Sequence, residues 1–423
     1  MRILPLIYLT YMFIGLYMTS FFLILYFKNR KTLFNTPTPN RHYNVSVLIP
    51  AYNEEDTIED TIKAVLASKY PLKEVIVIND GSKDRTKEIV QELMKKYSKL
   101  KLLDKPNSGK ADSINCGFKM AEGELVVVVD ADGYPASDAI DNMVGYFNDE
   151  KMAAVTALIT PKNRNNFIEK LQTYEYPIIS WTRKLLGYVD GIYVNPGAMS
   201  MYRKEAILKV GGFDTTNMTE DIEMTWKLTY YGYHRGVSLT AKDKTEVPST
   251  LKKWWKQRVR WNLGGLQTIM KYKSLFLKKG MLGCFILPFF VTSLLLGLIG
   301  LSIFTYLIIR RFIFSFLITT YSFEVGVSPI TFNELNITPT VLNFLGIALF
   351  ALGLFFTYFG IISVGESRIL RKRNIFNLLF YLIVYLTIYP TIMIVSIYKY
   401  LKGDIGWGTK DFKLKQQNKI IKK

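Results

Sequence analysis

The chain has 423 residues, and its 54 lysines and arginines outnumber its 35 aspartates and glutamates, which gives a formal charge of +19. It is also 49% hydrophobic and 14% aromatic. Intrinsic disorder requires few apolar residues, so this composition excludes a disordered basic chain. The apolar residues are concentrated in long blocks, which predicts an integral membrane protein with a large polar domain.

The first apolar block is close to the N-terminus. Residues 4–27 are apolar almost throughout, and this length suits one transmembrane helix. Lys28, Arg30 and Lys31 follow the block. Because basic flanks stay on the cytoplasmic side, we expect the N-terminus to face outward. We therefore assign residues 1–27 to an N-terminal transmembrane helix.

The later apolar blocks lie at 281–309, 312–321, 341–363 and 375–401. Arg310 and Arg311 interrupt the region 281–321, which could form one span or a tight pair. Pro390 could divide the last block into an interfacial helix and a span. The basic segment 366–374 and the basic tail both have cytoplasmic character, although one span between them would separate them. We predict four to six membrane segments, a C-terminal transmembrane region at 281–401 and a cytoplasmic tail at 402–423.

The polar region 44–275 alternates between strand and helix patterns. Short apolar runs rich in β-branched residues predict strands at 45–50, 74–80, 124–130 and 153–159, and helices are expected at 54–68, 84–97, 110–121 and 138–147. This alternation predicts an α/β, Rossmann-like domain with a mostly parallel, doubly wound sheet. Ligands bind such sheets at the carboxyl ends of the strands.

Polar side chains follow three of the predicted strands. Tyr52 and Glu54 follow the first strand, Asp80 ends the second, and Asp130 and Asp132 follow the third. Taken singly, each acid could be a turn residue or a helix cap. Three acidic strand ends on one edge of a sheet would repel one another, so together they predict a site that binds a cation.

Asp130 and Asp132 are two residues apart, and in an extended segment their side chains point to the same side. Carboxylate oxygens suit Mg²⁺ or Mn²⁺, and such a metal commonly bridges the phosphates of a nucleotide. The only cysteines are Cys116 and Cys284, and the chain has two histidines. These numbers exclude a disulfide framework and a Cys/His metal cluster.

The motifs PAYNEE, DGSKD, GKADSIN, DAD, TED and QRVRW occur in this order along the chain. The series resembles the membrane-embedded, processive family 2 glycosyltransferases, which are the cellulose, chitin, hyaluronan and poly-N-acetylglucosamine synthases. The resemblance extends from residue 45 to the last membrane block. It implies a GT-A fold, a UDP-sugar donor and inversion at the anomeric carbon.

The resemblance also implies roles for individual residues at the nucleotide. Tyr52, Glu54 and Asp80 would hold the uridine, and Lys110 would contact the diphosphate. Asp130 would help close the nucleotide site, and Asp132 would bind the Mg²⁺ or Mn²⁺ ion.

Inverting transfer is a single displacement, and the attacking hydroxyl needs a general base within hydrogen-bond reach. Asp221, beside Glu220 in the TED motif, resembles the base of the family, and we assign both residues to the catalytic set. Thr219 or Asp221 could also cap the helix that follows. The two interpretations are compatible, because the start of a helix fixes a carboxylate well.

The QRVRW motif would stabilise the leaving group and bind the acceptor. Arg260 would contact the diphosphate, whose charge develops as the bond breaks, while Gln257, Trp261 and the loop residue Gly197 would line the acceptor site. The same segment could be a basic amphipathic helix at the membrane surface with Trp254 and Trp255 as anchors. We expect one helix to serve both purposes.

Near the C-terminus, the segment 407–410 (WGTK) resembles a gating element of hyaluronan and related synthases. Lys410 replaces the more usual arginine, which weakens the case for a bidentate phosphate contact. A juxtamembrane turn followed by a lipid-binding tail explains the segment equally well.

The context of the TED and QRVRW motifs is most similar to that of the poly-N-acetylglucosamine synthases. We therefore expect transfer of N-acetylglucosamine to the end of a growing β-linked polysaccharide, coupled to translocation across the membrane. The expected partners are a UDP-sugar, the polysaccharide, the lipid bilayer and a small membrane accessory subunit, with no nucleic acid. The expected location is the plasma membrane, with several spans and a cytoplasmic catalytic domain.

Two alternatives belong to other functional classes. A non-processive enzyme would place a single sugar on a polyprenyl phosphate or glycolipid, although such enzymes generally lack QxxRW. A non-enzymatic basic membrane protein would bind nucleic acid or anionic lipid. That protein would not need carboxylates at the strand ends.

Overall fold

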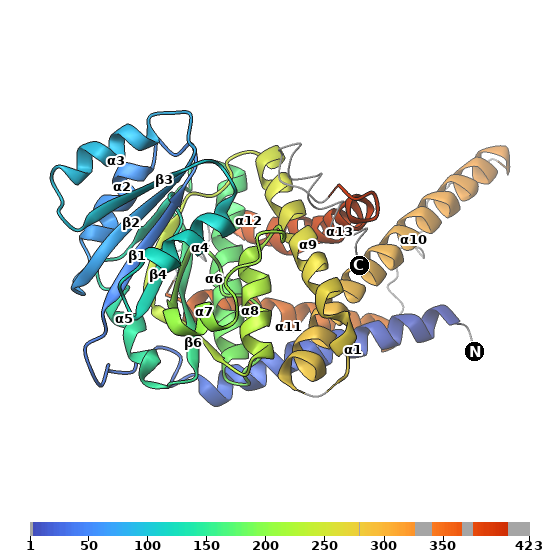
Figure 1. Cartoon of the computed structure of the whole chain (residues 1–423). Helices are drawn as coiled ribbons and strands as arrows, with labels where there is room; N and C mark the ends of the chain where they lie inside the picture. Colours follow the sequence, from blue (N-terminus) through green and yellow to red (C-terminus); the bar gives the residue numbers. More distant parts are fainter. Residues whose placement is uncertain (1–2, 279, 326–340, 366–374, 405–423) are drawn as a thin grey trace.

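The computed structural model describes residues 3–278, 280–325, 341–365 and 375–404. A sheet flanked by helices lies at one end of the molecule, and the long apolar helices extend from the other end (Figure 1). The α/β prediction is therefore confirmed, together with the α-helical region of membrane-spanning character.

The sheet has eight strands in the order β3-β2-β1-β4-β7-β6-β8-β5. β1 is parallel to β2 and β4, and β2 is parallel to β3, whereas β7 is antiparallel to β4 and β6. The doubly wound parallel half is thus β3-β2-β1-β4, and the second half of the sheet is mixed. The strands are β1 (Val45–Ala51), β2 (Leu72–Asp80), β3 (Leu100–Lys105), β4 (Leu125–Val129), β5 (Gly133–Pro135), β6 (Met152–Pro161), β7 (Met199–Arg203) and β8 (His234–Thr245).

Helices cover both faces of this sheet (Figure 1). Most predicted helices are present with shorter bounds, and α6 and α7 are additional. The helices of this part are α2 (Ile58–Leu66), α3 (Thr86–Met94), α4 (Lys110–Met120), α5 (Asp141–Val144), α6 (Phe167–Gly187), α7 (Lys204–Lys209), α8 (Glu220–Tyr230) and α9 (Leu251–Tyr272).

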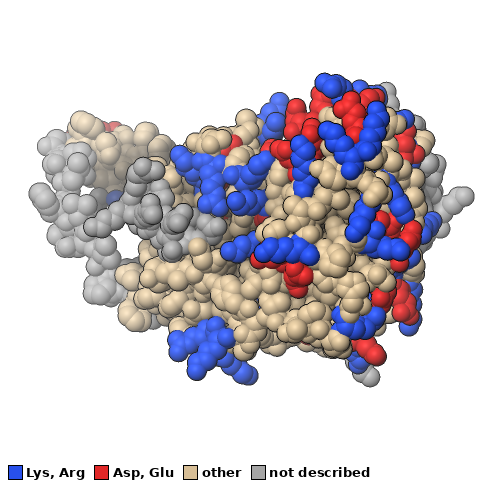
Figure 2. Space-filling model, turned by 90° about the vertical axis from the view of Figure 1, so that its left-hand side faces the viewer, with Lys and Arg blue, Asp and Glu red and all other residues tan. Residues whose placement is uncertain are grey.

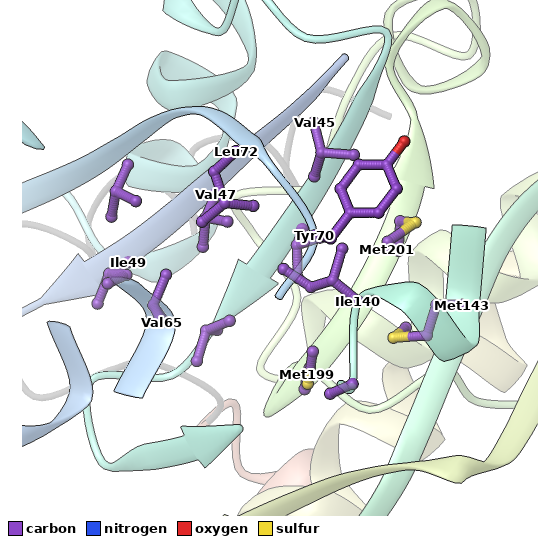
Figure 3. Close-up of a cluster of buried hydrophobic side chains, with 14 of the residues drawn as sticks. Val45, Val47, Ile49, Val65, Tyr70, Leu72, Ile140, Met143, Met199 and Met201 are labelled. Atoms are coloured by element: carbon purple, nitrogen blue, oxygen red, sulfur yellow. The ribbon is translucent and has the colours of Figure 1, made fainter. Parts of the chain in front are cut away.

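Alternate residues of β1 contribute to two separate cores. Val47 and Ile49 pack with Val65 of α2 in one core, shown in Figure 3, whereas Leu48 packs with Phe118 of α4 on the opposite face. Each fully buried aliphatic side chain of this kind stabilises the fold by about 1.5–3 kcal/mol. The continuous apolar run of β1 follows from this burial on both faces. Packing on both faces therefore holds β1 and its carboxyl end in position.

In the described ranges, four helical segments are long and apolar enough to cross a membrane: Pro5–Asn29, Leu282–Val325, Phe344–Ser363 and Phe376–Leu401. They overlap with α1 (Ile3–Asn29), α10 (Leu287–Val325), α11 (Val341–Ser363), α12 (Ile375–Phe380) and α13 (Leu386–Leu401). The helix α10 continues through Arg310 and Arg311, so the region 281–321 forms one helix and not a tight pair. Pro390 lies inside α13 and does not end it, whereas a π-helical turn, Tyr381–Tyr385, precedes α13. The basic segment 366–374 and the WGTK segment 407–410 lie outside the described residues.

Candidate active site

The sheet order brings the acidic strand ends together. β2, β1 and β4 are neighbouring parallel strands, so Asp80, the segment after Ala51 and the segment after Val129 meet at one edge. Charged side chains of both signs lie on the face of the molecule shown in Figure 2. Tyr52 is 45% exposed at this edge, as an aromatic surface for a ligand would be.

Asp80 is buried and shapes the loop before α4. Its carboxylate accepts hydrogen bonds from the backbone N–H of Ser108 at 2.9 Å and of Gly109 at 2.8 Å, and from the Lys105 ammonium at 2.5 Å. Gly109 has a φ of +96°, a conformation that favours glycine. Because Lys110 begins α4 directly after this loop, Asp80 fixes the place from which the Lys110 side chain extends.

Lys110 joins two of the predicted motifs. Its ammonium donates to the Asp130 carboxylate and lies 3.5 Å from Glu220 Oε1. Burial lowers the pKa of Lys110, but the carboxylates of Asp130 and Glu220 outweigh this effect and raise the pKa above its ordinary value. Lys110 is therefore a permanent cation between the DAD and TED segments.

Asp221 lies at the start of α8, next to the loop that contains Gly197. Its carboxylate accepts hydrogen bonds from the N–H of Ile222 at 2.9 Å and of Gly197 at 3.2 Å. A β-carbon on Gly197 would lie 3.0 Å from Lys110 Nζ, so this glycine lies directly beside the ammonium. Burial and the neighbouring Glu220 raise the pKa of Asp221. A raised pKa makes this carboxylate a stronger base than an exposed aspartate.

The surroundings of Asp132 suit a divalent cation. Burial and the charges of Asp130 and Glu54 raise the pKa of Asp132 to about 7. Burial also raises the pKa of Glu54, against a hydrogen bond from Thr57. Hard carboxylate oxygens that repel one another fit Mg²⁺ or Mn²⁺. Among the described residues, no group of three or more His, Cys, Asp or Glu side chains forms a complete metal site.

Asp243 of β8 is a buried acid that sequence reasoning missed. It is 1% exposed, burial and the charges of Asp130 and Asp132 raise its pKa, and neither carboxylate oxygen has a hydrogen-bond partner within the described part of the chain. The residues around it alternate between exposed Lys242 and Lys244 and buried Asp243. This period of two in AKDKT is the signal that could have placed the acid inside.

Arg183 of α6 is a second residue that the sequence did not reveal. Burial lowers the pKa of its guanidinium, whereas Tyr193 and Asp221 act in the opposite direction. Its Nε is buried and has no hydrogen-bond partner in the described part of the molecule. A lone arginine within a helical pattern gives no signal of this position near Asp221.

The QRVRW segment lies in α9, where Arg258 is the most buried of its charged residues. The Arg258 guanidinium is fully buried, pairs with Glu175 of α6 at 2.6 Å and lies 4.0 Å from the centroid of the Trp261 ring. It also donates to the Gln257 side chain. Gln257, Arg260 and Trp261 are each half-buried. Gln257 and Trp261, both predicted for the acceptor, are thus joined through Arg258, which the sequence analysis did not single out.

Trp254 corrects one expectation. We predicted a membrane-surface anchor, but its side chain is fully buried and its indole N–H donates to the Tyr385 hydroxyl at 2.5 Å. The physical reason is that α9 packs against the C-terminal helices, and a buried indole needs a hydrogen-bond acceptor. Trp255 is half-buried in the same cluster of apolar side chains.

The TED segment is docked on α9. A β-carbon on Gly264 would lie 1.9 Å from the Thr219 hydroxyl oxygen, and the N–H of Met218 donates to Gln267 Oε1 at 2.8 Å. On the other side, Tyr176 of α6 interacts electrostatically with both Arg258 and Asp132. The structure therefore places the acidic cluster, the TED segment and the QRVRW helix next to one another.

Comparison with known proteins agrees with this arrangement. Residues 46–211 match the family model described as glycosyl transferase family 2. The chain is 32% identical to a poly-beta-1,6-N-acetyl-D-glucosamine synthase of Staphylococcus epidermidis over 87% of each chain, and 38% identical to one of Staphylococcus aureus over 54% of this chain and 56% of that protein.

One solved structure has the same fold as this chain over most of the length of both chains. It is the mannosyltransferase PcManGT from Pyrobaculum calidifontis in complex with GDP-Man and Mn²⁺, with a TM-score of 0.60, 19% identity and coverage of 93% of this chain and 98% of that one. The GT-A fold is thereby confirmed. The chain is a glycosyltransferase and belongs to family 2, together with the poly-beta-1,6-N-acetyl-D-glucosamine synthases.

Proposed function

We propose that this enzyme transfers N-acetylglucosamine from UDP-N-acetylglucosamine to the end of a growing β-linked polysaccharide and passes the product through its own membrane helices. The similarity in sequence to the two staphylococcal poly-beta-1,6-N-acetyl-D-glucosamine synthases supports the choice of sugar and of polymer. The helices of membrane-spanning character support a multi-pass plasma membrane protein with a cytoplasmic catalytic domain.

The observation that carries the chemistry is the cluster around Lys110. One ammonium contacts Asp130, lies 3.5 Å from Glu220 and adjoins Gly197, whose N–H donates to Asp221. A cation that would bind phosphate and a half-buried carboxylate that would act as base therefore both adjoin one glycine. A transfer reaction needs both groups near the reacting carbon, one for the leaving group and one for the attacking hydroxyl.

In the proposed reaction, the acceptor hydroxyl oxygen attacks the anomeric carbon as the bond from that carbon to the diphosphate oxygen breaks. Asp221 takes the hydroxyl proton. Lys110 and Arg260 stabilise the charge on the departing UDP. Asp132 would hold Mg²⁺ or Mn²⁺, which neutralises the diphosphate when it is bound. Attack from the face opposite the leaving group inverts the configuration.

Donor and acceptor would lie on different elements. Tyr52, Glu54 and Asp80 would form the uridine side, where Tyr52 offers an exposed ring and Asp80 holds the adjoining loop. Gln257, Trp261 and Gly197 would form the acceptor side. The flat C–H face of a sugar packs well on an indole ring, which gives Trp261 its place in the proposal.

The decisive experiment incubates the purified, detergent-solubilised protein with Mn²⁺ and each radiolabelled UDP-sugar in turn, and then sizes the products. We expect high-molecular-weight material from UDP-N-acetylglucosamine alone. A single-sugar lipid product would instead indicate non-processive transfer to a polyprenyl phosphate or glycolipid. Asp221→Asn serves as the inactive control for both products.

A second arm tests translocation. The enzyme is reconstituted into sealed vesicles with its catalytic domain outside, and the polymer is challenged with a glycoside hydrolase added externally. Protection of the polymer until detergent is added supports export through the chain itself. Complete digestion without detergent would contradict export, although not synthesis.

A further inference from the structure

A buried network of four side chains joins the QRVRW helix to the last membrane helix. It consists of Glu175 of α6, Arg258 of α9, Tyr385 at the end of the π-helical turn and Tyr389 of α13 (the Glu175 network). Glu175 is 3% exposed and Arg258 is fully buried. Its members come from three segments far apart in the sequence, and α9 and α13 lie beside each other in Figure 1.

The carboxylate of Glu175 is fully coordinated. One oxygen accepts hydrogen bonds from Arg258 Nη2 and from the Tyr385 hydroxyl, each at 2.6 Å, and the other accepts from the Tyr389 hydroxyl. The Tyr389 hydroxyl in turn accepts from Arg258 Nε at 2.9 Å. A charge pair this deeply buried is retained at a considerable desolvation cost, which a pair of apolar side chains would avoid.

The remaining surface of Arg258 faces the acceptor side. Its third nitrogen donates to Gln257, and its guanidinium lies over the Trp261 ring at 4.0 Å from the centroid. The planar guanidinium therefore fixes both residues that we assign to the acceptor, while Glu175 fixes the guanidinium. A planar group that stacks on an indole ring while its three nitrogens donate to three different residues is specific to arginine.

We propose that Glu175 and Arg258 are positioning residues, which hold Gln257 and Trp261 in register with the membrane helix that contains Tyr389. Resting on the proposed function, this inference makes the network the link between the sugar bound at Trp261 and the membrane path that receives it. It predicts that substitutions in the Glu175 network slow elongation, whereas UDP binding and donor hydrolysis, which depend on Lys110 and Asp132, are retained.

The test separates positioning from simple stability. Glu175→Gln and Arg258→Met each leave one buried group without its partner, so both single variants should melt at lower temperature. The double variant removes both charges and should recover most of the melting temperature. We expect the double variant to bind UDP with Mn²⁺, and to hydrolyse UDP-N-acetylglucosamine with water as acceptor, within about twofold of the wild type. Its elongation should stay at least about tenfold lower, because Trp261 has lost its cation.

Tyr389→Phe provides the milder variant and keeps both charges. We expect normal UDP binding and donor hydrolysis but shorter polymer and a higher KM for an added acceptor oligosaccharide. Tyr381→Phe is the matched control, because Tyr381 is a buried tyrosine of the same segment that packs its ring against Tyr385. Its polymer should have wild-type length.

The results of these assays distinguish a positioning role from a purely structural one. If the double variant regains elongation along with stability, or if Tyr389→Phe makes polymer of wild-type length, the Glu175 network has a structural role only and the inference is wrong. If the wild type itself makes no polymer from any UDP-sugar, the proposed function fails instead. Wild-type donor hydrolysis in the same assay keeps these two failures distinct.

Discussion

Gly264 in α9 and Thr219 before α8 are in direct contact, so closely that a β-carbon on Gly264 would lie 1.9 Å from the Thr219 hydroxyl oxygen and 2.7 Å from its backbone nitrogen. The contact joins the helix of the QRVRW motif to the segment that begins the TED motif. The absence of a side chain at Gly264 therefore allows the segment with the proposed base to lie directly against the helix with the proposed acceptor residues.

Gly264→Ala should push the TED segment away from α9. Because a misplacement of about 1 Å at a reacting group costs on the order of a hundredfold in rate, we expect a loss of transfer of about tenfold to a hundredfold. UDP binding should change little, since Lys110 and Asp132 are on other elements. Steady-state transfer rates and calorimetric titration with UDP measure the two effects.

Gly265→Ala is the matched control. Its β-carbon would meet only the Phe290 ring, at 3.3 Å, and alanine favours the helix by about 1 kcal/mol over glycine. This variant should retain transfer and melt at the same or a higher temperature. Equal losses in the two alanine variants would show that helix packing in general, and not the Thr219 contact, causes the defect.

Asp132→Asn should remove the metal dependence of nucleotide binding. The neutral amide is a weaker ligand for Mg²⁺ or Mn²⁺ than a carboxylate. In calorimetry, the wild type should bind UDP much more tightly with Mn²⁺ than with EDTA, and the variant should bind equally weakly in both. Asp60→Asn, an exposed acid on α2, should behave as the wild type. Metal-dependent binding that survives in Asp132→Asn would move the metal to other residues.

The parts of the fold that could be predicted are those buried on both faces. β1, β2 and β4 are continuous apolar runs, and their polar ends converge because neighbouring parallel strands end at one edge. β3 was missed because it is an edge strand in which Lys101 and Asp104 are exposed. β7 and β8 were missed because their sequences, MSMYR and HRGVSLTAKDKT, mix polar and apolar residues, and only tertiary pairing makes them strands.

The residues of the candidate site also differ in whether the sequence could predict them. Lys110, Asp130 and Asp221 belong to short local motifs, so the sequence could place them at strand and helix ends. The Glu175 network could not be predicted, because Arg258 is 83 residues and Tyr385 is 210 residues from Glu175 along the chain. A buried charge pair of this kind leaves no periodic pattern, and each member alone resembles an ordinary residue of an amphipathic helix.

Lys110→Met should weaken nucleotide binding. Removing a cation that contacts a charged group costs about 1.5–3 kcal/mol, which corresponds to a loss of UDP affinity of roughly tenfold to a hundredfold. Mn²⁺ alone should bind more tightly to the variant, because Asp130 and Asp132 lose the ammonium whose positive charge competes with the metal. Lys119→Met, at the exposed end of the same helix, controls for net charge. Unchanged UDP affinity in Lys110→Met would exclude the diphosphate contact.

The pH dependence of transfer tests the base. Only the ionised carboxylate of Asp221 can accept the hydroxyl proton, and burial and Glu220 raise its pKa above the ordinary 3.8. As the pH falls through this raised pKa, Asp221 takes up a proton and the rate falls. The acid limb of kcat/KM should therefore lie at a higher pH than for an exposed aspartate.

Glu220→Gln tests directly whether Asp221 is the general base. The variant removes the negative charge that disfavours ionisation of Asp221 and leaves Lys110, which favours it. The pKa of Asp221 should fall, so the acid limb should move to lower pH, while Asp221→Asn should lose about a hundredfold to ten-thousandfold in rate at every pH. An acid limb that stays in place in Glu220→Gln would mean that another group than Asp221 accepts the proton.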